Sequence, residues 1–165
     1  MRLNCLIVFV LSVAGTMAGC APPPAASSAA MSPAQQKAVA DSVRTVTDSV
    51  WAAGNRRDLD RLFGFYSVNC TLLQDGRPDP WPAHQAAARV FYSSLQAAEV
   101  RPLDYGIDVL SPTVAVWHGT YSYKLTDKTG KVISGAAANT WVLHREPGGW
   151  RIVHVHISNP PVPGR

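Results

Sequence analysis

Cysteine and long apolar runs are scarce in this sequence, and clusters of basic residues are missing. Three cysteines, Cys5, Cys20 and Cys70, occur in 165 residues. The apolar run at residues 5–14 has the length of a signal-peptide core and is too short to span a bilayer as a mature helix. The formal net charge of +4 is scattered, with no basic cluster beyond Arg56 and Arg57, which argues against a nucleic-acid-binding surface.

The first 20 residues have the pattern of an export signal. Arg2 precedes the apolar run, and residues 17–20 read Met-Ala-Gly-Cys. Small residues at the two positions before a cysteine resemble a bacterial lipobox, which implies that Cys20 becomes the acylated N-terminus. The alternative is an ordinary signal peptide cleaved near Gly19. Because several acyl chains anchor a protein firmly, we expect a tethered envelope protein facing the periplasm, and Ala21 favours the outer membrane.

The chain divides into four segments with different expected roles. Residues 1–19 are the lipoprotein signal peptide, 20–31 the lipidated cysteine and a Pro/Ala/Ser tether, 32–159 one folded domain, and 160–165 a C-terminal tail. Pro and small residues cannot form a core, so residues 20–31 act as a spacer. With Cys5 removed and Cys20 lipidated, Cys70 has no disulfide partner and is predicted to be an inert buried thiol.

The first part of the domain is mainly helical. Ser32, Pro33 and Gln35 predict a capped helix start, and valines spaced four, three and four residues apart continue it to Gly54 and Asn55. These valines are Val39, Val43, Val46 and Val50. A short helix is expected from residue 58, a strand over 68–74, irregular chain around the prolines that follow, and a helix over 83–97. The expected buried face of the last helix is Ala87, Val90, Phe91 and Leu95.

The second part alternates with a period of two, which predicts four strands over about 100–110, 113–125, 131–145 and 150–158. Helices followed by a meander of long strands predict an α+β domain, with three N-terminal helices packed on one face of a curved antiparallel sheet. A three-residue turn at 147–149 would place Trp141 opposite Val155 and Asn139 opposite Ile157.

The C-terminal pattern resembles the nuclear transport factor 2-like (SnoaL-like) superfamily, and most of all the association domain of calcium/calmodulin-dependent kinase II and its bacterial relatives. The resemblance covers roughly residues 35–159, and its motif residues are Val142, His144, Arg145, Gly148, Trp150, Ile152, Val153, His154, His156 and Ser158. It implies a cone of three helices and a bent sheet around a pocket. Arginines that bind small carboxylates in the association domains align with Gly119, Trp141 and Ile157 here, which implies a more apolar, aromatic pocket.

Alternation separates the two faces of the sheet. The face toward the helices is expected to line the pocket, together with Tyr66 from the helical part. These residues are Tyr66, Trp117, Gly119, Tyr121, Tyr123, Asn139, Trp141, Val155 and Ile157. The outer face carries His118, Thr140, His154 and His156, and outer faces in this superfamily often form dimer interfaces, so we expect a homodimer.

Three functions fit these patterns. The aromatic face suits a pocket for a small, largely apolar ligand, although the same rings could simply fill the core. Alternatively, the resemblance implies an isomerase, dehydratase or hydrolase, in which Asp108 and Tyr121 would act as the acid/base pair, although local spacing fixes no Asp-His or Asp-Tyr pair. The histidines of the outer face could bind zinc. Because no cysteine or carboxylate stands close to them in sequence, we expect no metal or cofactor.

Overall fold

A computed structural model describes residues 30–160. The expected signal peptide, Cys20, nearly all of the tether and residues 161–165 lie outside this range. The described chain contains the helices α1 (Pro33–Arg56), α2 (Leu59–Phe63) and α3 (Trp81–Ser93). It also contains the strands β1 (Tyr66–Gln74), β2 (Arg77–Pro78), β3 (Leu95–Ser111), β4 (Val114–Asp127), β5 (Val132–Glu146) and β6 (Gly149–Ser158). Within residues 30–160, no helix has both the length and the apolar character that crossing a membrane requires.

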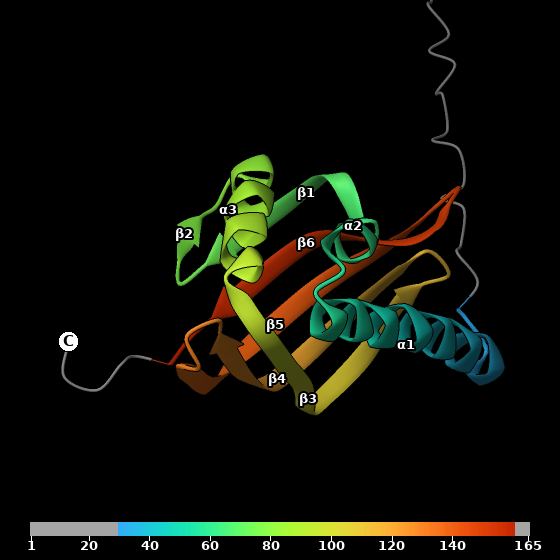
Figure 1. The fold of residues 1–165 in the computed structure, drawn as a ribbon. Coiled ribbons are helices and arrows are strands. Elements are labelled where there is room, and N and C mark those ends of the chain that lie inside the picture. The colour runs from blue at the N-terminus through green and yellow to red at the C-terminus, as the bar shows by residue number, and fades with distance from the viewer. Residues whose placement is uncertain (1–29, 161–165) are drawn as a thin grey trace, which may run out of the picture. The chain divides into compact units, whose positions relative to one another are not determined.

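The six strands form one sheet in the order β2-β1-β6-β5-β4-β3, and the helices pack on it (Figure 1). This confirms the predicted α+β fold. All neighbouring strands are antiparallel except β1 and β6, which run parallel, so the sheet is mixed rather than purely antiparallel. In the chain, β1 is joined to the meander through β2 and α3, and in the sheet it pairs with the last strand, β6. Helix α1 lies along β3, and α3 lies beside β1.

Helix α1 begins as the sequence predicts. The Ser32 hydroxyl accepts a hydrogen bond from the Gln35 backbone N–H at 3.3 Å, and Gln35 Oε1 accepts one from the Ser32 N–H at 2.8 Å. Val43 and Val50 of the predicted stripe are buried. The helix runs past the predicted end to Arg56 and stops where Arg57 adopts a left-handed conformation, with φ 59°.

Helix α3 differs from the prediction in its bounds and in its buried face. It starts at Trp81, with Pro82 in its first turn, so this proline begins a helix rather than keeping the chain irregular. It ends at Ser93, and Leu95 already belongs to β3. Val90 and Phe91 are 72% and 42% exposed and Ala87 is exposed as well, so the predicted buried face is wrong at these three positions. Leu95 is buried as predicted, but in β3.

The orientation of α3 is set by Trp81. This side chain is buried, stacks on Tyr66 with ring centroids 4.7 Å apart, and meets Phe63 edge-on at 5.7 Å. Residues three, seven and eleven positions after Trp81 therefore face the sheet, and they are His84, Ala88 and Tyr92.

The β5–β6 hairpin has the predicted pairing for a different reason. Trp141 lies opposite Val155 and Asn139 lies opposite Ile157, as predicted. However, Glu146 pairs with Gly149, so the turn contains two residues rather than three. A β-bulge at Val153 then shifts the register by one residue. Because of this bulge, Ile152 and Val155 both point toward the helices and are buried.

Candidate functional site

A cavity of about 170 Å³ lies between the helices and the sheet. Aromatic side chains reach it from all three helices and from β1, β4 and β5. They include Trp51 from α1, Tyr66 from β1, Trp81 and Tyr92 from α3, Tyr121 from β4 and Trp141 from β5. Trp51 stacks on Trp141 with ring centroids 4.8 Å apart. The wall is therefore built largely from ring faces held by both the helices and the sheet.

Six of the nine residues expected to line a pocket lie along this cavity. They are Tyr66, Tyr121, Asn139, Trp141, Val155 and Ile157. The structure brings them together because β4, β5 and β6 are neighbours in the sheet and their inward positions are in register.

The other three residues lie elsewhere. Trp117 is packed in the core between Tyr105 and Trp141, with ring centroids 5.5 and 4.9 Å away. Tyr123 covers Gly135 on the neighbouring strand, and a Cβ at Gly135 would lie 2.6 Å from the tyrosine Oη. The expectation that these two line the pocket is wrong. Trp117 is enclosed by the rings of its neighbours, and Tyr123 lies over the open space that Gly135 leaves on the sheet.

Gly119 lies where the sheet bends. The register of β3 against β4 shifts between Pro102 and Asp104, and a Cβ on Gly119 would lie 2.3 Å from the Asp104 carbonyl oxygen and 2.6 Å from Tyr105 Cβ. Glycine is required for this close approach of the two strands. The residue shapes the sheet instead of lining the pocket.

Two polar groups in the cavity wall have no hydrogen-bond partner. They are Asn139 Oδ1 and Trp141 Nε1, and among the described residues no other buried side-chain nitrogen or oxygen shares this property. Asn139 is 6% exposed and Trp141 is 2% exposed. The two stand two residues apart on β5, so both side chains point into the cavity from the same face. Leaving a buried polar group unpaired costs about 1–3 kcal/mol.

His84 and Asp79 form a second polar feature of this region. His84 Nδ1 lies 2.8 Å from Asp79 Oδ2, and the imidazole stacks on Trp81 at 5.7 Å. The Asp79 backbone N–H donates to the Leu72 carbonyl at 2.9 Å, which ties the loop before α3 to β1. His84 lines the cavity, and since Asp79 occupies Nδ1, Nε2 is the ring nitrogen left for another partner. The sequence prediction missed this pair.

The tyrosines of the cavity stay protonated at neutral pH. Burial raises the pKa of Tyr121 to about 12 and raises the pKa of Tyr66 and Tyr92 above the ordinary value of 10. Their hydroxyls are therefore neutral hydrogen-bonding groups. No Lys, Arg, Asp or Glu in residues 30–160 lines the cavity.

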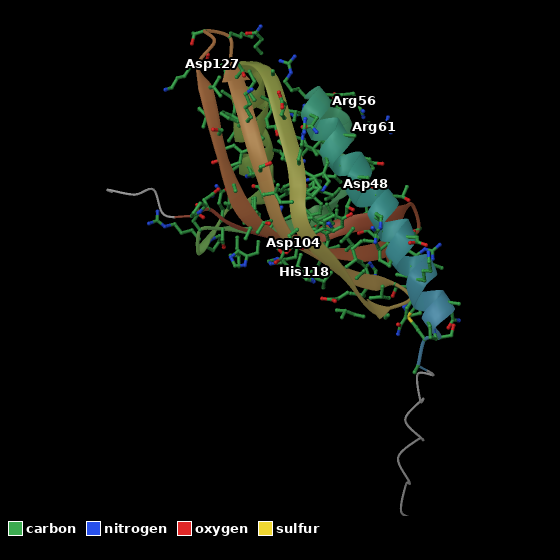
Figure 2. All side chains as sticks on the ribbon, turned by 90° about the horizontal axis from the view of Figure 1, so that it is seen from below. Asp48, Arg56, Arg61, Asp104, His118 and Asp127 are labelled. Atoms are coloured by element: carbon green, nitrogen blue, oxygen red, sulfur yellow. The ribbon has the colours of Figure 1, made fainter. Side chains whose placement is uncertain are left out.

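The structure separates the two residues expected to act as an acid/base pair. Asp108 is exposed on the outer face, where Oδ2 lies 3.1 Å from His118 Nε2, whereas Tyr121 lines the cavity. Tyr105 and Ile107 pack against the core, so alternation along β3 turns Asp104 and Asp108 outward. Figure 2 shows Asp104 and His118 at the bend of the sheet, on the side away from α1. The predicted Asp108–Tyr121 pair is wrong.

The remaining predicted residues lie on the outer face. Thr140 stands between His118 and His156 in the strand register, and His154 Nδ1 lies 2.7 Å from Thr71 Oγ1. In the part of the chain that the structure describes, no three His, Cys, Asp or Glu residues gather closely enough to hold a metal ion.

Comparison with known proteins places this geometry in a family. The sequence matches the SnoaL-like domain family over residues 43–163, which is well over half of the chain. None of the curated proteins compared with it matches.

Three solved structures illustrate the shared fold. A proposed calcium/calmodulin-dependent protein kinase II association domain from Xanthomonas campestris is 23% identical over 72% of this chain and 86% of its own, with a TM-score of 0.63. A nuclear transport factor 2-like protein from Salmonella enterica is 17% identical over 78% and 95%, with a TM-score of 0.65. A proposed dehydratase from Streptomyces avermitilis is 14% identical over 77% and 99%, with a TM-score of 0.67. With the match over residues 43–163, the chain belongs to the SnoaL-like domain family, and its fold is that of nuclear transport factor 2-like proteins.

Proposed function

We propose that this domain binds a small, largely apolar molecule in the cavity between α1, α3 and the sheet. The observation that carries this proposal is the pair of buried, unpartnered atoms Asn139 Oδ1 and Trp141 Nε1. A core that served packing alone would place apolar side chains at both positions, because each unpaired group weakens the fold. A ligand that pairs with both atoms removes that cost when it binds.

Protein purified from its native host provides the direct test. Native mass spectrometry should detect a non-covalent adduct on the protein that is released on denaturation. The Asn139→Leu and Trp141→Phe variants should carry less of the adduct than the wild type. Wild-type protein that carries no adduct, and that binds nothing from a chemically diverse set of small molecules, would contradict the proposal.

A second candidate function is catalysis on the bound molecule. The His84–Asp79 pair at the cavity favours it, because a carboxylate orients the imidazole and leaves Nε2 free to accept a proton. One protein of the same fold carries the name of a dehydratase, which makes an isomerase, dehydratase or hydrolase the reaction class to test. Once an assay shows turnover, His84→Ala and Asp79→Asn should each slow it at least about a hundredfold. Unchanged rates would remove the pair from any mechanism.

We also propose that the domain forms a homodimer through the outer face of the sheet and is tethered to the periplasmic side of a membrane by lipidated Cys20. Two observations support the first idea: the name of the Xanthomonas association domain, and the outer-face surface where His118 and His156 are exposed beside the half-buried Thr140. The residues before Cys20 support the second. Light scattering that gives a monomer mass would refute the dimer. Equal incorporation of labelled palmitate into wild type and Cys20→Ser would refute the tether.

A further inference from the structure

We infer that the cavity takes a neutral molecule with a single aromatic ring and an attached amide or hydroxyl group, which donates one hydrogen bond to Asn139 Oδ1 and accepts one from Trp141 Nε1. This inference rests on the proposed binding function and specifies its ligand.

The size of the cavity limits the ligand to about one ring. Its volume is about 170 Å³. An engineered apolar cavity of about 150 Å³ in another protein holds one benzene molecule. A ring with one short polar substituent therefore fits, whereas a fused multi-ring molecule would require the walls to move.

The wall composition favours a flat ring over an alkyl chain. Trp51 and Trp141 present stacked indoles 4.8 Å apart, and Tyr66 stacks on Trp81 at 4.7 Å on another side. Aromatic rings gain energy beyond simple area burial when they stack or meet edge to face. A planar ligand can use these surfaces without disturbing their packing.

The described wall argues against a strongly ionised ligand, because its only ionisable groups are tyrosines and His84, whose Nδ1 already faces Asp79. No Lys or Arg of residues 30–160 lines the cavity to pair with a carboxylate, and no Asp or Glu lines it to pair with an ammonium group. Burying an ion without a partner costs far more than the contacts of one ring return. An amide or a phenol remains neutral at physiological pH and avoids this cost.

The two unpartnered atoms define the polar part of the ligand. An indole N–H only donates, and an amide oxygen only accepts. The ligand must therefore offer an acceptor to Trp141 and a donor to Asn139. A primary amide supplies both through its C=O and NH₂, and a phenol supplies both through one hydroxyl.

The test compares four small probes by isothermal titration with the full-length Cys20→Ser protein: benzamide, phenol, toluene and benzoate. A neutral hydrogen bond changes affinity about two- to tenfold. We therefore expect benzamide and phenol to bind at least about fivefold more tightly than toluene, and benzoate to bind more weakly than benzamide at pH 7. Trp141→Phe should reduce benzamide affinity about two- to tenfold and leave toluene affinity nearly unchanged.

Trp150→Phe is the matched control. Trp150 is also a buried tryptophan, but its Nε1 donates to Ser42 Oγ at 2.9 Å, and it does not line the cavity. Its replacement should leave the benzamide affinity unchanged. Equal binding of toluene and benzamide, or tightest binding of benzoate, overturns this inference but leaves the proposed apolar pocket standing. Failure of all four probes also overturns it, and an adduct from the native host would then show whether the pocket binds another class of molecule.

Discussion

Asn139→Leu should make the ligand-free protein more stable. Asn139 Oδ1 is buried and unpaired, and leucine has the same branched shape without polar atoms. The substitution removes the cost of the unpaired group and adds apolar burial. We expect the free energy of unfolding to rise by about 1–3 kcal/mol, with the melting temperature rising roughly 4 °C per kcal/mol for a domain of this size.

Urea denaturation followed by circular dichroism measures this change, and Asn55→Leu is the matched control. Asn55 Nδ2 donates to the Val100 carbonyl at 3.0 Å, and its Oδ1 accepts from the Val100 N–H at 2.6 Å. Here the same substitution removes two hydrogen bonds, so the free energy of unfolding should fall by about 1–3 kcal/mol. The same Asn-to-Leu substitution should therefore raise the free energy of unfolding at position 139 and lower it at position 55.

A fall of more than about 1 kcal/mol in the unfolding free energy of Asn139→Leu would refute this reasoning. It would mean that an internal water satisfies Oδ1 in the free protein, since buried waters pair such groups and are costly to remove. Asn139 would then be a structural residue, and its amide would no longer indicate a ligand.

Three further predictions concern titratable groups. Burial raises the pKa of Cys70 to about 12, which leaves very little reactive thiolate. In a Cys5→Ser, Cys20→Ser variant, Cys70 should react with Ellman's reagent at pH 8 at least about a hundredfold more slowly than free cysteine. Unfolding the protein should abolish this difference in rate. The pKa of Tyr121 is about 12 in the fold and ordinarily 10, so the contribution of this protonated hydroxyl to stability is fully present below pH 10 and should be lost as the pH rises from 10 to 12. Tyr121→Phe should therefore reduce the alkaline fall in unfolding free energy measured by urea titration. An unchanged dependence on pH would contradict the burial of the hydroxyl. Hydrogen bonds from the Asn159 backbone and side chain lower the pKa of Asp75. The stabilisation from the ionised Asp75 carboxylate is therefore present above pH 3.8 and should disappear as the pH falls further. Below pH 3.8, the unfolding free energy of Asp75→Asn should depend less steeply on pH than that of the wild type.

The sequence predicts local and alternating features well. The capping box at Ser32 and Gln35 is correct because all of its contacts lie within four residues. The pairing of Trp141 with Val155 is also correct, but it results from two errors that cancel. The turn is one residue shorter than predicted, and the bulge at Val153 restores the register. A bulge depends on which side chains the core accepts, and no pattern within the hairpin reveals it.

The helical side of the cavity could not be predicted in the same way. Trp81 follows Pro78 and Pro80, so the sequence predicts irregular chain there. In the structure, however, its contacts with Phe63 and Tyr66 set the rotation of α3 about its axis. His84 and Asp79 are five residues apart across a helix start, a spacing that matches no regular period. Their meeting depends on how the loop docks on β1, which only the tertiary structure shows.

The bend at Gly119 limits how the proposed pocket could come to bind a different class of molecule. Any side chain at this position would meet the Asp104 carbonyl oxygen and Tyr105, so an arginine there requires β3 to move away from β4. Trp141 and Ile157, in contrast, lie on β5 and β6 and take no part in this close contact between β3 and β4. A charged side chain could thus enter the pocket wall at Trp141 or Ile157 with the present sheet, whereas a charge at Gly119 would first require the sheet to change shape.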